Sequence, residues 1–145
     1  MTARRTAQAV WEGDLIKGHG MVHGAPGALP TVNVSWAART EQQGTQTSPE
    51  ELLAAAHASC FSMALSAALG RQQHPPTKLE VTAVATFDKI GEAWKITTVE
   101  LTVVGHVPGI TPEQFQAAAK GASEGCPVSQ ALKGNVAISV NARLA

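Results

Sequence analysis

Two cysteines are the residues of this chain that could do nucleophilic or redox chemistry. Cys60 lies in an alanine-rich apolar stretch, with His57 and Ser59 as polar neighbours. Cys126 directly precedes Pro127, which predicts the N-cap of a short helix, where free N–H groups and the helix dipole lower the pKa of a thiol. Each cysteine also has a simpler interpretation. Cys60 could be a small buried hydrophobic residue, and Cys126 could serve only the geometry of a helix start.

A thiolate at Cys60 needs a positive neighbour. The predicted start of its helix, Pro49, is eleven residues earlier, about 16 Å along the axis, and dipole effects fade within the first turn. His57, one turn before Cys60, could help if it were protonated, although a buried histidine is usually neutral near neutral pH. Arg39 is the one arginine in mid-chain, between a predicted strand and this helix. Its other interpretation is a solvated loop charge.

Metal binding is the main alternative role for these side chains. His57 and Cys60 have the i, i+3 spacing of a ligand pair on a helix. The sequence offers no second ligand pair at the spacing of zinc sites, however, and its carboxylates are not clustered. We therefore expect neither a metal ion nor a bound organic cofactor.

The helix that carries Cys60 has the clearest boundaries in the sequence. Ser48 is the predicted N-cap, Pro49 suits the first helical position and Glu51 stands where a capping box needs an acid. Residues 52–69 are apolar on nearly every side, and Gly70 can end the helix. Such a helix is expected to be covered on most sides, inside a domain or a dimer, rather than to span a membrane.

The remaining patterns predict strands around this helix and two further helices. The expected strands are residues 8–12, 21–23, 31–36, 79–87, 94–104 and 136–142, with a polar loop at 39–47. A capping box at 111–114 opens a helix that Gly125 closes, and a short helix follows at 128–133. This order is typical of an α+β fold with antiparallel sheets and helices on one face.

Composition limits the class of protein. The 145 residues suggest one domain, 1–145, and only 15% are charged, against about 25% in an average domain. A second copy is expected to cover part of the apolar surface. Formal net charge is zero, which argues against a nucleic acid or an anionic membrane as partner. The first residues form no apolar run, so a cytoplasmic protein with reduced thiols is expected, and a redox role is favoured over a structural disulfide.

The two cysteine segments together resemble the OsmC/Ohr family, and its OsmC branch most. They are residues 48–65 (SPEELLAAAHASCFSMAL) and 125–129 (GCPVS), and segments 11–14, 107–110 and 133–138 also stand where that branch has them. The resemblance covers essentially the whole chain. It implies an intertwined homodimer of α+β fold that reduces organic hydroperoxides and hydrogen peroxide, in defence against oxidative or osmotic stress.

The resemblance also implies a role for each site residue. Cys60 corresponds to the peroxidatic cysteine and Cys126 to the resolving cysteine, with a disulfide between them as intermediate. Arg39 corresponds to the arginine that stabilises the thiolate, and Glu50 to the acid that holds this arginine. The implied reductant is a dithiol of the lipoyl type. A thiol–disulfide oxidoreductase and a non-catalytic stress-related binding protein remain as alternatives.

Helix geometry adds an expectation about assembly. Glu50 and Cys60 are ten residues apart, which on one continuous helix means about 15 Å in height and about 80° in direction. Glu50 therefore cannot hold a group that touches Cys60 of its own chain. A two-fold dimer removes the conflict if Arg39 and Glu50 face Cys60 of the partner chain.

Overall fold

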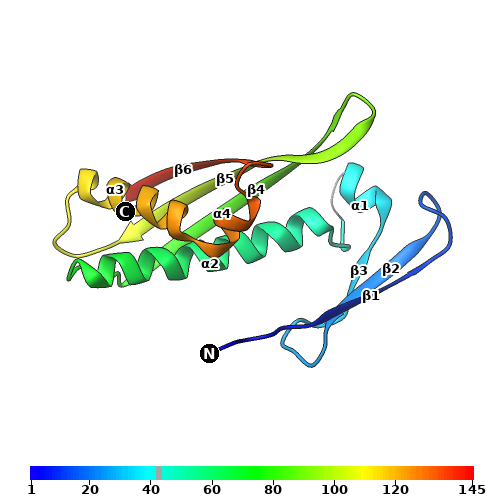
Figure 1. The fold of residues 1–145 in the computed structure, drawn as a ribbon, viewed down its shortest axis with the longest axis horizontal. Coiled ribbons are helices and arrows are strands. Elements are labelled where there is room, and N and C mark those ends of the chain that lie inside the picture. The colour runs from blue at the N-terminus through cyan, green and yellow to red at the C-terminus, as the bar shows by residue number, and fades with distance from the viewer. Residues whose placement is uncertain (42–43) are drawn as a thin grey trace. The chain divides into compact units, whose positions relative to one another are not determined.

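A computed structural model describes residues 1–41 and 44–145 of the chain (Figure 1). These residues divide into two compact units, 1–52 and 53–145. The strands are β1 (Ala7–Glu12), β2 (His19–Gly24), β3 (Val32–Val34), β4 (Lys78–Ile90), β5 (Ala93–His106) and β6 (Ala137–Leu144). The helices are α1 (Trp36–Thr40), α2 (Pro49–Arg71), α3 (Pro112–Gly125) and α4 (Pro127–Leu132).

The first unit is built on an antiparallel sheet in the order β1-β2-β3. A parallel bridge from Val34 to Thr47 extends its pairing toward the start of α2. This sheet has little covering of its own, since Val10 and Trp11 remain 45% and 42% exposed. The unit therefore presents apolar surface that a further surface could bury.

Helix α1 corrects the prediction for residues 31–36 and for the loop at 39–47. Trp36 begins α1 instead of ending the strand, because the Ser35 hydroxyl caps the helix by accepting a hydrogen bond from the Ala38 N–H at 3.1 Å. Arg39 consequently lies in the last turn of α1 and not in a loop. Residues 42 and 43 of the predicted loop lie outside the described residues.

Helix α2 starts as predicted and ends slightly later. The Glu51 N–H donates to the Ser48 hydroxyl at 3.1 Å, which confirms Ser48 as the cap. The helix continues through Gly70 to Arg71, and Gln73 takes the left-handed conformation beyond it, with φ 63°. Helix α2 is long and apolar enough to cross a membrane by length and composition alone, with a mean hydropathy of 1.6.

One side of α2 belongs to the core of the second unit. The fully buried residues on it recur every fourth position: His57, Phe61, Leu65 and Leu69. Other parts of the helix surface are open in the single chain, and Met63 is 66% exposed. The single chain therefore does not cover α2 on most sides, and the expected cover within a dimer stays a prediction.

The sheet of the second unit has the order β4-β5-β6 and is mixed. Strand β4 is antiparallel to β5, as predicted, but β6 runs parallel to β5, so the prediction of purely antiparallel sheets is wrong for the last strand. The helices α3 and α4 lie between β5 and β6 in the chain. They provide the long crossover that a parallel pair requires, whereas a short turn would have given an antiparallel one.

The helices of the second unit cover one face of this sheet, as the sequence predicted (Figure 1). Alternate residues of the strands share the core with Phe61, Leu65 and Leu69 of α2 and with Phe115 of α3: Leu79, Val81, Ala83, Ala85, Val99, Leu101, Val103, Ile138, Val140, Ala142 and Leu144. The capping box that opens α3 is confirmed in both directions between Thr111 and Gln114. Cys126 ends α3 and is the N-cap of α4.

Gly105 of β5 provides a test of this packing. A Cβ atom there would lie 2.4 Å from the ring of Phe115, which is fully buried. Gly105→Ala should therefore lower the free energy of unfolding by about 1–3 kcal/mol, because the ring must move within a filled core. Urea unfolding measures this loss.

Gly121→Ala is the matched control, since it lies on α3 and its Cβ would meet no atom within 4 Å. This change should be neutral or stabilising, because alanine favours a helix more than glycine does. Equal unfolding midpoints for the two variants would contradict the packing of Phe115 against Gly105.

Candidate active site

The two cysteines meet in the second unit. Their Sγ atoms are 3.1 Å apart although the residues are 66 positions apart in the chain, and both are free thiols. Cys60 comes from the middle of α2 and Cys126 from the N-cap of α4. Cys126 is completely buried, whereas Cys60 is partly exposed. A reagent that comes from solvent can therefore reach the sulfur of Cys60 first.

The pKa values of the two thiols are shifted in opposite directions in this unit. Burial raises the pKa of the Cys60 thiol, the Val128 N–H opposes this, and the neighbouring Cys126 raises the pKa further. Burial also acts to raise the pKa of Cys126, but the net shift is downward. The groups that lower this pKa are the Ser129 N–H, the Cys60 thiol, the Ser129 hydroxyl and the Val128 N–H. Within this unit, the thiolate is therefore favoured on Cys126 and the proton on Cys60.

These pKa shifts bear on two expectations. A lowered pKa was expected for Cys126 as the N-cap residue, and the first amides of α4 provide it. A thiolate at Cys60 was expected to need a positive neighbour, and within this unit burial raises the pKa of Cys60. The groups that act on Cys60 here carry no positive charge, so they cannot offset its burial.

His57 does not provide the missing charge. Its ring is fully buried, and its Nε2 lies 2.7 Å from Oγ of Ser129 on α4. Burial lowers the pKa of His57, which keeps the imidazole neutral near neutral pH. A neutral imidazole carries no charge to stabilise the Cys60 thiolate, and its contact is with Ser129.

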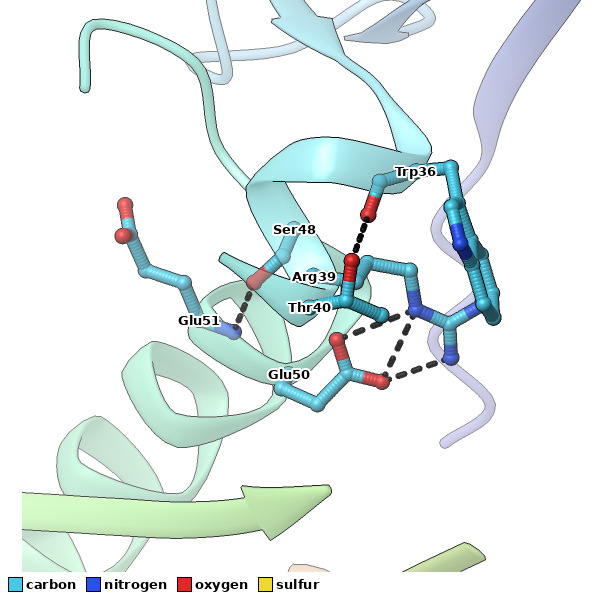
Figure 2. A network of polar contacts seen from close by, with 6 residues as sticks. All are labelled: Trp36, Arg39, Thr40, Ser48, Glu50 and Glu51. Atoms are coloured by element: carbon cyan, nitrogen blue, oxygen red, sulfur yellow. Dashed lines mark hydrogen bonds and ion pairs between the residues drawn. The ribbon is translucent and has the colours of Figure 1, made fainter. Parts of the chain in front are cut away.

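Arg39 and Glu50 form a second pair, in the first unit. Arg39 Nη2 donates to Glu50 Oε1 at 2.7 Å, and Arg39 Nε lies 3.2 Å from both carboxylate oxygens (Figure 2). The Glu50 side chain is 8% exposed and that of Arg39 is 28% exposed. The guanidinium carbon also lies 5.6 Å from the centre of the Trp36 ring. These contacts fix the plane of the guanidinium group.

The backbone around this pair is held by further side chains. Thr47 Oγ1 donates to the Glu51 carboxylate at 3.1 Å. Ser48 caps the start of α2 by accepting from the Glu51 N–H (Figure 2). Glu50 and Glu51 therefore have different partners: Glu51 contacts Thr47 near the start of the helix, while Glu50 receives Arg39. The assignment of Glu50, and not Glu51, as the partner of Arg39 agrees with this geometry.

A cavity of about 320 Å³ lies beside Arg39 in the first unit. Its lining is mostly apolar: Trp11, Leu15, Val34, Ser35, Trp36, Arg39 and Pro49. A cationic group in an apolar wall can bind a molecule that has one polar end and one apolar end. Phe61 does not line this cavity, because it lies in the core of the second unit.

The predicted site residues thus form two contacting pairs, one in each compact unit. Residues that the sequence reasoning missed are Ser129, which contacts His57, and Trp11 and Leu15, which line the cavity. The position of Ser129, three residues after an N-cap cysteine, was the available signal for its role. In the described part of the chain, no three His, Cys, Asp or Glu side chains are grouped so that they could hold a metal ion.

Comparison with known proteins gives consistent results. Residues 42–141 match the family model OsmC, described as OsmC-like protein. The chain is 41% identical over 138 residues to the peroxiredoxin OsmC of Escherichia coli strain K12, with 95% of this chain and 96% of that protein covered. It is 32% identical over 104 residues to the organic hydroperoxide resistance protein OhrA of Bacillus subtilis strain 168, with 70% and 71% covered.

A solved structure agrees with these sequence matches. It is an organic hydroperoxide resistance protein from Elizabethkingia anophelis, crystallised with thiocyanate bound. The TM-score is 0.76 at 25% identity, and the comparison covers 100% of both chains. This structure supports the same fold for the whole of the present chain.

The Arg39–Glu50 pair allows a stability test that does not depend on any activity. Because Glu50 is buried, removal of Arg39 leaves a carboxylate without its cation. Arg39→Met should therefore lower the free energy of unfolding more in the wild type than in a Glu50→Gln background. A double-mutant cycle in urea should give a coupling of about 1–3 kcal/mol.

The exposed pair Lys78–Glu80, with side chains 60% and 50% exposed, is the control and should couple far less. A coupling at Arg39–Glu50 no larger than that of the control would contradict a tightly held guanidinium.

Proposed function

This chain belongs to the OsmC family, and we propose that it is a thiol peroxidase that reduces hydroperoxides with Cys60 and Cys126. The observation that carries the proposal is the 3.1 Å contact between the two free thiols, one partly exposed and one buried. Two of its relatives are named peroxiredoxin and organic hydroperoxide resistance protein, and the paired thiols are what such chemistry requires.

The reaction has three steps. The Cys60 thiolate attacks the outer oxygen of the hydroperoxide, the O–O bond breaks, and the alkoxide leaves and takes a proton to become an alcohol, or water from hydrogen peroxide. The Cys126 thiolate then attacks the sulfur of the Cys60 sulfenic acid, and the S–O bond breaks with loss of hydroxide, which becomes water. A dithiol finally reduces the disulfide by exchange and is itself oxidised.

The different exposure of the two sulfurs supports these roles. A peroxide from solvent can approach Cys60, which is partly exposed, but not Cys126, which is completely buried. Cys126 instead touches the Cys60 sulfur, so it can attack the sulfenic acid as soon as that forms. Early disulfide formation protects Cys60 from further oxidation to a sulfinic acid.

Arg39 provides the positive charge that Cys60 needs in the first step. Burial raises the pKa of Cys60 in its own unit, so its thiolate requires a cation from elsewhere. A guanidinium group offers several donors in one plane, which can bind a thiolate and a peroxide oxygen together. Glu50 holds this group with two carboxylate oxygens, and the Trp36 ring supports its other side.

The site is shared between two chains of an intertwined homodimer. Helix α2 is continuous from Pro49 to Arg71, so Glu50 and Cys60 stay about 15 Å apart along its axis. An arginine held by Glu50 therefore suits Cys60 of a second copy better than that of its own chain. The exposed Met63 on α2 and the exposed Val10 and Trp11 on β1 offer apolar surface for this assembly. The two units of each chain then function as parts of one domain, 1–145.

The substrates and the setting follow from the same residues. The apolar cavity beside Arg39 suits the organic group of an alkyl or aryl hydroperoxide, while hydrogen peroxide needs only the polar end. The reductant is a dithiol of the lipoyl type, since two thiols on one molecule complete the exchange without a second partner. The protein acts in the cytoplasm as part of a defence against oxidative or osmotic stress.

The roles of the cysteines can be separated with one equivalent of cumene hydroperoxide. Cys60→Ser should abolish peroxide consumption, because the attacking sulfur is missing. Cys126→Ser should consume one equivalent and leave a Cys60 sulfenic acid, which a second equivalent of hydroperoxide then oxidises to a sulfinic acid. Titration of free thiols and mass spectrometry of the protein follow both outcomes.

The wild type should lose both thiols and recover them with a dithiol. Equal and complete loss of the first turnover in both variants would refute the assigned roles. A wild-type protein that ignores the peroxide but exchanges with protein disulfides would instead be a thiol–disulfide oxidoreductase. A protein that reacts with neither would be a non-catalytic binding protein.

Shared sites predict complementation between inactive variants. Cys60→Ser and Glu50→Ala chains should each be nearly inactive alone. After co-refolding, each mixed dimer should contain one site with every wild-type group, because Glu50 from one chain serves Cys60 of the other. Peroxidase activity per confirmed mixed dimer should return to about half that of the wild-type dimer, if the two sites work independently. Confirmed mixed dimers without activity would mean that each chain builds its own site.

A further inference from the structure

His57 and Ser129 form a buried polar contact that the proposed reaction does not use. His57 is 0% exposed and Ser129 is 5% exposed, and their Nε2 and Oγ atoms are 2.7 Å apart. The residues come from α2 and α4, 72 positions apart in the chain. His57 precedes Cys60 by three residues, and Ser129 follows Cys126 by three. Each residue of the contact is therefore about one helical turn from a thiol along its own helix.

The surroundings of the imidazole determine its tautomer. Nδ1 of His57 is buried and has no hydrogen-bond partner in the described part of the chain. A buried N–H without an acceptor is rare in proteins, whereas a nitrogen lone pair without a donor costs less. The proton is therefore on Nε2, and His57 donates it to the Ser129 oxygen. The Ser129 hydroxyl, with one proton of its own, can then donate to another group.

Cys126 is the N-cap of α4 and Ser129 is the third residue of that helix, so the two side chains are one helical turn apart in the chain. The Cys126 sulfur accepts no side-chain capping hydrogen bond, and the Ser129 N–H and hydroxyl act in the direction that lowers the pKa of Cys126. A serine in a helix can also turn its hydroxyl toward a carbonyl three or four residues earlier, which would withdraw the proton from the sulfur. The Nε2–H of His57 opposes this rotation, because it fixes where the Ser129 oxygen accepts.

We propose that His57 is a positioning residue for the resolving cysteine, because its Nε2–H orients the Ser129 hydroxyl toward the Cys126 sulfur. The inference rests on the proposed peroxidase function and adds residues to it. In the second step, the oriented hydroxyl stabilises the thiolate that forms the S–S bond while the S–O bond of the sulfenic acid breaks. In the third step, the reductant attacks the accessible Cys60 sulfur, and Cys126 leaves as a thiolate that receives the same hydrogen bond.

Other ionisable groups near this contact are Cys60, Glu124 and Lys133. Cys60 on α2 faces Cys126 directly. Glu124 of α3 and Lys133, after α4, line a cavity of about 250 Å³ together with Ser129. The sheet contributes apolar core residues such as Val99 and Leu101. Glu124→Gln and Lys133→Met therefore serve as controls for long-range charge effects on Cys126.

The test follows the second step alone. Reduced protein receives one equivalent of cumene hydroperoxide, and quenched samples give the amounts of sulfenic acid, trapped with dimedone, and of disulfide. Ser129→Ala and His57→Leu remove the hydroxyl and its orienting donor. Disulfide formation should slow roughly three- to tenfold at pH 7, because fewer Cys126 thiols are ionised, while the rate of peroxide consumption should stay within about twofold.

The pH profile distinguishes positioning from general damage. A higher pKa of Cys126 in these variants means that the loss is present below the wild-type pKa and disappears above the raised one, where both proteins carry the thiolate. His57→Gln, which retains an N–H near the position of Nε2, should recover most of the rate. Leu69→Val, a core change three turns further along α2, should lower stability without moving the profile.

Several results would overturn the proposal. Equal slowing at every pH would indicate a structural role, and an unchanged second step would indicate none. If His57→Leu does not fold, two measurements still test the proposal. Ser129→Ala removes the hydroxyl, and the nitrogen NMR signals of His57 in the wild type show which ring nitrogen carries the proton. A proton on Nδ1 contradicts the proposal. If the wild type consumes no peroxide, the peroxidase function fails. The pH dependence of the Cys126 thiolate absorbance in Cys60→Ser protein, compared with and without Ser129→Ala, then tests the relation to His57 by itself.

Discussion

The 3.1 Å contact between Cys60 and Cys126 is the constraint on which the chemistry depends. It requires α2 to place Cys60 beside the first turn of α4, although the chain forms two long strands and a further helix between them. The row of buried residues at every fourth position of α2, from His57 to Leu69, fixes the rotation of that helix against the core. This rotation also explains why Cys60 is partly exposed: the residue lies beside the buried row and not within it.

The sequence predicted well those features that local chemistry determines. Ser48 and Thr111 cap the predicted helices, and Cys126 is the predicted N-cap. Local patterns failed where a neighbour decided the outcome. A cap at Ser35 converts the end of an alternating strand into α1, which carries Arg39, and a crossover through two helices makes β6 parallel. Neither the cap nor the parallel pairing produces a periodic pattern of apolar residues from which it could be predicted.

The site was predictable in its residues but not in its electrostatics. The resemblance to a known family identified four candidate residues: Cys60, Cys126, Arg39 and Glu50. In the structure, Cys60 contacts Cys126 and Arg39 contacts Glu50. The direction of the Cys60 pKa could not be foreseen, because it depends on burial and on a neighbouring thiol far away in the sequence. The same distance concealed the contact between His57 and Ser129, which lie 72 residues apart.

The unequal acidities of the two thiols suit the order of the proposed reaction. Only the first step needs a thiolate on Cys60, and the second and third steps need it on Cys126, first as nucleophile and then as leaving group. The unit that holds both cysteines favours Cys126, the state required in two of three steps. In the proposed reaction, the first step takes its cation, Arg39, from another unit. Once Cys60 becomes a neutral sulfenic acid, it no longer competes with Cys126 for negative charge. Under this proposal, an arginine that acts only in the first step allows one pair of sulfurs to exchange roles within a single cycle.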